Sequence, residues 1–122
     1  MEPFDLDIKE FCRESGLSEK NYFDLVEIVL KITAKDLPVL EDALAQDNFS
    51  SIRNISHRLG GAYLNLSINV IGTILGNINY FAKMEKEKEK IGELLKEFSE
   101  YAQYLEKEFL PYGQNKNQGL GC

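Results

Sequence analysis

The chain has 122 residues, of which 43 % are hydrophobic, and this suits a single domain with a real core. The 20 acidic and 14 basic residues give a net charge of −6, so the basic stripe of a nucleic-acid-binding surface is not expected, nor is attraction to an anionic membrane. Two cysteines, Cys12 and Cys122, are too few for a disulfide framework, and the lack of a CxxC pair or a second histidine predicts no metal site.

The first element in chain order is a short amphipathic helix. The acidic start, MEPFDLDIKEF, lacks the apolar core of a secretory signal. Apolar side chains at Leu6, Ile8, Phe11 and Cys12 follow helical spacing, and Ser15-Gly16 is expected to end the helix, because glycine readily takes the left-handed closing conformation.

A long helix is predicted next, with Ser18 as its N-cap. Apolar residues at helical spacing, including Leu25 and Ile32, are expected to face the core. Pro38 lacks an amide hydrogen and is expected to kink the helix near Ala34, a break into two helices being the alternative.

Three further helices complete the predicted fold. One follows Asp47 or Asn48 as its cap, one covers residues 69–84, and one covers residues 91–109 and ends at Pro111. No apolar run reaches the ~18 residues that span a membrane, and no strand-like alternation occurs. We predict an all-α, antiparallel up-down four-helix bundle over residues 1–110, with a short extra N-terminal helix and a flexible tail at residues 111–122.

The segment around the only histidine is informative because it predicts a bare outer face. With about 100° per residue and Ile55 set at 0°, the apolar stripe of the helix covers about −20° to +80°, and His57 falls at about 200°, on the opposite side. We therefore expect His57 to face solvent. Gly60 and Gly61 are predicted to flank the imidazole, which gives a partner's backbone or a phosphoryl group room to approach. The alternative is that the glycines let another helix pack closely.

Charge on this segment would favour an anion. No aspartate or glutamate occurs from Asn48 to Met84, whereas Arg53 and Arg58 lie close to the histidine along the helix. Either arginine could accompany a phosphate, although both could be ordinary solvated side chains. A solvent-facing imidazole is largely neutral at cellular pH and is a competent nucleophile toward an activated phosphoryl group.

The stretch His57-Arg58-Leu59-Gly60-Gly61-Ala62-Tyr63-Leu64-Asn65-Leu66 resembles the signature of the histidine-containing phosphotransfer family, roughly H-x-L-K-G-x-x-x-N-[LI]-G. The likeness covers about residues 5–108. Gly60 stands where the family often has lysine, and Ser67 replaces the usual glycine. Arg53 or Arg58 could supply the charge of the missing lysine.

The resemblance implies a phosphoryl carrier rather than an autonomous enzyme. His57 would accept the group from a phospho-aspartate on the receiver domain of a response regulator or hybrid kinase and pass it to a second receiver. The receivers would supply Mg²⁺ and the catalytic carboxylates, so that no cofactor is expected on this chain. The docking face would include Arg53, Gly60, Gly61 and Leu64. We expect a cytoplasmic monomer that binds neither nucleic acid nor membrane.

Two other interpretations of the sequence stay open. The bundle could dock on receivers or kinases without accepting phosphate, or His57 could act as a general base in an enzyme. The chain could also be free-standing, which Met1 favours, or one domain of a larger kinase.

Overall fold

The computed structural model describes the backbone of residues 7–121 and the side chains of residues 7–108. This part of the chain forms five helices and no strands, which confirms the all-helical prediction. The helices are α1 (Ile8–Ser15), α2 (Glu19–Ala45), α3 (Phe49–Asn65), α4 (Asn69–Met84) and α5 (Lys88–Gly121). Within the described residues, no helix combines the length and the apolar character needed to cross a membrane.

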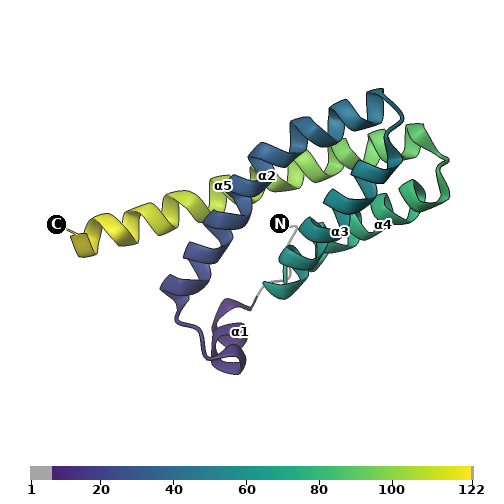
Figure 1. Ribbon diagram of the computed structural model, residues 1–122. Coiled ribbons are helices and arrows are strands. Elements are labelled where there is room, and N and C mark those ends of the chain that lie inside the picture. Colours follow the sequence, from purple (N-terminus) through teal and green to yellow (C-terminus); the bar gives the residue numbers. More distant parts are fainter. Residues whose placement is uncertain (1–6, 122) are drawn as a thin grey trace.

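Each of the four long helices packs against two of the others, so that they follow one another in a ring. Helices α3 and α4 form the most extensive pair, α2 contacts both α3 and α5, and α5 also packs on α4. The short helix α1 lies against the start of α2, at one end of the molecule (Figure 1). Helix α3 is therefore held between α2 and α4, and the side facing away from both is left uncovered by the other described helices.

Local side-chain chemistry begins and ends the first helices as predicted. The Ser18 side chain accepts a hydrogen bond from the Asn21 amide at 3.0 Å, and the Asn48 side chain accepts one from the Ser51 amide at 3.2 Å. Of the two caps considered for α3, Asn48 is the one used. Gly16 closes α1 with φ +81°, in the left-handed region where glycine carries no Cβ penalty.

The next three helices all end in the same hydrogen-bonded motif, with a residue other than glycine in the left-handed position. In each, the left-handed residue and the one after it donate amide hydrogen bonds back to the last turn, as Ser67 does to Leu64 at 2.9 Å and Ile68 to Tyr63 at 2.9 Å. The left-handed residues have φ of 56° at Asp47, 60° at Ser67 and 52° at Glu85. Three sharp turns are thus made without glycine.

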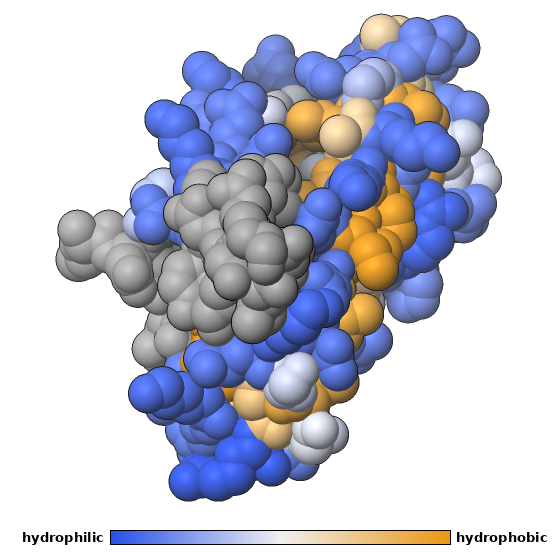
Figure 2. Space-filling view, turned by 90° about the vertical axis from the view of Figure 1, so that its left-hand side faces the viewer, coloured by the Kyte–Doolittle hydropathy of each residue, from blue (hydrophilic) through white to orange (hydrophobic). Residues whose placement is uncertain are grey.

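Helix α2 runs without interruption through Pro38, so the alternative of two separate helices is wrong. The inward prediction for Leu25 and Ile32 is also wrong, because these side chains are 37 % and 39 % exposed. Together with Ile28 and Val39 they form an apolar stripe at helical spacing along one side of α2. On the side of the molecule seen in Figure 2, hydrophobic residues reach the surface as a strip between hydrophilic ones.

Helix α5 continues past Pro111 to Gly121, so the predicted end at Pro111 is wrong. Proline removes one intrahelical hydrogen bond, and a helix can continue beyond it, usually with a bend. The division into a domain of residues 1–110 and a tail of residues 111–122 stays a prediction. Leu6 and Cys122, and the side chain of Phe109, for which an inward position was expected, lie outside what the structure describes. Cys12 is a buried free thiol.

Two buried tyrosines attach α3 to α2. The Tyr22 hydroxyl donates to the Leu66 carbonyl at 2.8 Å. Thr33 Oγ1 lies 2.6 Å from the Tyr63 hydroxyl and donates its own hydrogen to the Val29 carbonyl at 2.9 Å, so Tyr63 is the donor in the first contact. Burial raises the pKa of Tyr22 and that of Tyr63 to about 12, because the phenolate would lose its hydration. These bonds fix the core side of α3 and, with it, the direction of the opposite face.

Candidate functional site: the outer face of α3

His57 lies on the uncovered side of α3 and is exposed. The turns on either side of it are anchored by Ile52, Leu59 and Tyr63, each at most 1 % exposed. Among the described residues, the imidazole has no hydrogen-bond or ion-pair partner. Both ring nitrogens are therefore open to a reacting group, as the helical geometry predicted.

The two glycines after the histidine lie in different surroundings. Gly61 is exposed, and a methyl group built on it would meet nothing within 4 Å. Gly60 is buried instead. A methyl group there would lie 3.4 Å from Leu75 Cβ and 3.9 Å from the Gly72 carbonyl oxygen. The expectation that both glycines bare the imidazole is therefore wrong for Gly60, where the alternative of close helix packing holds. Only Gly61 gives open access.

A pair of facing glycines brings α3 and α4 together. A methyl group on Gly72 would lie 3.6 Å from the Gly60 carbonyl oxygen, and the Gly60 position faces Gly72 in turn. A long side chain at position 60 would have to leave this contact. The departure from the family's usual lysine is thus matched by a local feature of this chain, a close approach of the two helices at that level.

The register of α3 on α4 places a third glycine beside the histidine. Gly60 faces Gly72, and one turn before His57 the Asn79 side chain contacts the Arg53 carbonyl. The two helices therefore run in opposite directions. Gly76 lies between Gly72 and Asn79, and so is level with His57. Gly76 is exposed, with nothing within 4 Å of a methyl group built on it. The surface without bulky side chains around the imidazole thus extends from α3 onto α4.

Leu64 is an apolar residue at the edge of this surface, and it is 51 % exposed. Its side chain lies across Gly72, since a methyl group on that glycine would overlap Leu64 Cδ2 at 2.5 Å. The outer end of Leu64 is therefore presented to solvent while its inner side rests on α4. The predicted apolar member of the docking face is accessible.

The Arg53 and Arg58 side chains differ in whether they have an ion-pair partner. The Arg58 guanidinium donates to Asp36 Oδ2 at 2.6 Å, on the α2 side of the helix. Arg53 is exposed, and its side chain has no ion-pair partner among the described residues. Both arginines were candidates to supply the positive charge of the lysine that the resembling motif often has in place of Gly60. Of the two, Arg53 is the one whose guanidinium has no ion-pair partner among the described residues. Asp36 was missed from the sequence because it reaches α3 only through the packing of α2.

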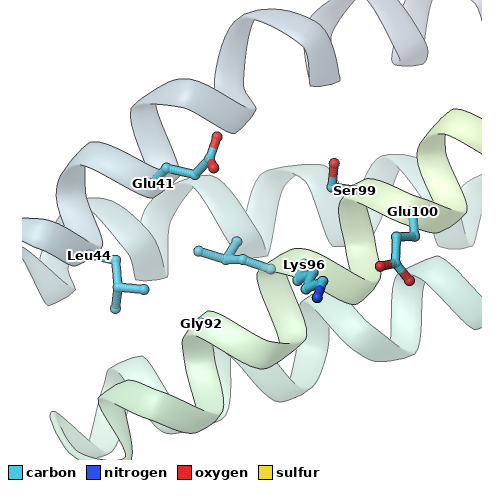
Figure 3. A pocket seen from close by; sticks show the side chains of 7 residues that line it. Glu41, Leu44, Gly92, Lys96, Ser99 and Glu100 are labelled. Atoms are coloured by element: carbon cyan, nitrogen blue, oxygen red, sulfur yellow. The ribbon is translucent and has the colours of Figure 1, made fainter.

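The described residues contain no group of three or more His, Cys, Asp or Glu side chains arranged to hold a metal ion. A cavity of about 330 Å³ lies elsewhere, between α2 and α5, and Figure 3 shows the side chains that line it. Its rim carries Glu41 and Glu100, as well as Lys96. The cavity is separate from the His57 face, because α5 packs on α2 and α4 and not on α3.

No family model, curated protein or solved structure matches the chain.

Proposed function

We propose that this protein is a histidine phosphotransfer carrier of a two-component phosphorelay. Helices α2 to α5 would form the antiparallel four-helix bundle of that family, with α1 closing one end. The observation that carries the proposal is an exposed, unpaired His57 imidazole beside Gly61 and Gly76, on helices that carry no carboxylate from Asn48 to Met84. The low negative charge of this face favours the approach of a phosphoryl group.

The chemistry is a pair of reversible phosphoryl transfers. A lone pair on one imidazole nitrogen attacks phosphorus of the receiver's phospho-aspartate, the phosphorus–oxygen bond breaks, and the aspartate leaves as a carboxylate. The reverse reaction with a second receiver returns the group to an aspartate. Mg²⁺ and the carboxylates that bind it would belong to the receiver. This chain would supply the nucleophile, the open docking face and the positive charge of Arg53.

Transfer of label from a phosphorylated receiver tests the proposal. The receiver is charged with ³²P in the presence of Mg²⁺ and incubated with the wild-type chain, with His57→Ala and with Lys96→Ala, a control on α5 away from the face. Label stable to base and labile to acid is expected on the wild type and on Lys96→Ala only. Label that persists in His57→Ala, or no label on the wild type with any receiver of the source organism, would refute the proposal.

The interpretation as a non-transferring docking module makes a different prediction in the same experiment. The wild type would bind receivers, as measured by calorimetry, and would take no label. The unpaired imidazole favours transfer over docking alone, since docking does not require a free nucleophile at the centre of the face.

A further inference from the structure

One backbone carbonyl next to the histidine receives more hydrogen bonds than the helix alone supplies. The Arg53 carbonyl oxygen accepts from Asn79 Nδ2 at 2.9 Å and from Ser56 Oγ at 3.2 Å. In an α-helix the same oxygen is the acceptor for the amide four residues later, which is that of His57. Asn79, on α4, therefore donates to the same carbonyl oxygen that accepts the backbone hydrogen bond of His57.

The place of this bond along the two helices is significant. Gly60 and Gly72 are in close contact on the C-terminal side of His57, and Asn79 binds Arg53 on its N-terminal side. The turn that carries the imidazole is thus fixed to α4 at both ends. Asn79 is half-buried and Ser56 is 1 % exposed, and the bond from Asn79 lies at the solvent-exposed edge of the contact between α3 and α4.

We infer that Asn79 is a positioning residue for His57. Its side-chain amide makes one of the two contacts between α3 and α4 that fix the turn of His57, the other being the contact between Gly60 and Gly72. These two contacts set the position and direction of the imidazole on the α3–α4 face. Without the amide donor, the Arg53 carbonyl keeps only bonds from its own helix, and the turn before His57 is no longer tied to α4. The consequence for phosphotransfer rests on the proposed function. Transfer depends strongly on the placement of the reacting atoms, so a looser turn slows the step.

Three variants separate positioning from a general contribution to folding. Asn79→Ala removes the donor, and Asn79→Asp keeps the shape but places a second acceptor against the carbonyl. Asn77→Ala is the matched control, because Asn77 is exposed on the same helix and has no hydrogen-bond partner among the described residues. The first readout is hydrogen exchange of the His57 amide, compared with the core amide of Leu59. The second is the imidazole NMR signal, which is unambiguous because the chain has one histidine.

Loss of one hydrogen bond predicts about a five-fold faster exchange of the His57 amide in both Asn79 variants. The Leu59 amide should change less, and Asn77→Ala should match the wild type. In transfer assays with a phosphorylated receiver, the maximal single-turnover rate of label transfer should fall by a similar factor, while the receiver concentration that gives half of that rate stays unchanged. The inference is overturned if the His57 and Leu59 amides accelerate equally, or if the Asn79 variants match Asn77→Ala. Absence of label on the wild type would count against the phosphorelay, while the exchange data would still decide the positioning role.

Discussion

Replacing Gly61 by alanine should make the protein more stable and a poorer phosphoryl acceptor. Glycine in a helix interior costs about 1 kcal/mol relative to alanine. Gly61 lies inside α3, and the added methyl group would meet nothing within 4 Å. Neither a clash nor strain opposes the gain, so the free energy of unfolding should rise by about 1 kcal/mol. For a domain of this size, that corresponds to a rise in Tm of about 4 °C.

Urea and thermal unfolding, followed by circular dichroism, measure the first effect, and the initial rate of label transfer measures the second. Gly92→Ala on α5 is the matched control. Its methyl group would lie 3.6 Å from Leu44 Cδ2, an ordinary contact, so a similar gain in stability is expected. Gly92 is remote from the α3 face, so transfer should be unchanged in that variant. In Gly61→Ala the methyl group occupies the space a docked receiver would enter, and transfer should slow several-fold.

Two results would contradict this reasoning. A loss of stability in Gly61→Ala would mean that the space beside the glycine is not open. Equal transfer rates in Gly61→Ala and the wild type would mean that no partner approaches the imidazole from that side.

The other predictions concern charge, ionisation and backbone strain. Arg53→Ala should slow transfer about ten-fold, because it removes a charged donor. Arg58→Ala should leave the transfer rate within about two-fold and lower the free energy of unfolding by about 1 kcal/mol, because the Arg58 end of its ion pair is 64 % exposed while the Asp36 end is 17 % exposed. Equal transfer rates in the two variants would exclude Arg53 as the phosphate partner. Burial raises the pKa of Tyr63 from 10.0 to about 12, so its contribution to the folded state is fully present below pH 10 and is lost as pH rises toward 12. Alkaline unfolding curves should show a loss of the order of 2–3 kcal/mol from Tyr63, which Tyr63→Phe removes, and a loss of similar size from Tyr22, whose pKa is also raised to about 12, which remains in that variant. Ser67→Gly should raise the free energy of unfolding by about 0.5–1 kcal/mol, since a residue at φ 60° carries left-handed strain that glycine avoids, and a drop in the urea midpoint would contradict that explanation.

Much of the helix arrangement was predictable because helix ends are local. The caps at Ser18 and Asn48 and the closing glycine at position 16 depend on side chains within a few residues, and all three act as expected. The exposure of His57 was also predictable, since its direction follows from its angle to the apolar stripe. The end of α5 was not predictable, because a proline can either end a helix or be carried within it.

The interpretation of the histidine's neighbours failed where it depended on other helices. Gly60 lies on the flank of α3, and a flank is buried or exposed according to which helix packs beside it. The partner of Arg58 is Asp36, on α2, and the pairing follows only from the register of two helices. Asn79 had no signal in the sequence at all, because its acceptor is a backbone carbonyl.

The left-handed conformation of Ser67 was not predictable from the sequence alone. Ser67 has φ 60°, in the left-handed region where glycine carries no Cβ penalty, so serine fills the position at some cost in strain.

The facing glycines at positions 60 and 72 also bear on how fast this surface can be recognised. Helices held this closely have little freedom to slide or separate, so an incoming molecule meets the α3–α4 face already in its final shape. Such an encounter loses little entropy to rearrangement, which allows brief contacts with fast exchange between successive molecules. Under the proposed function, a carrier that must release one receiver before it meets the next would benefit from that rigidity.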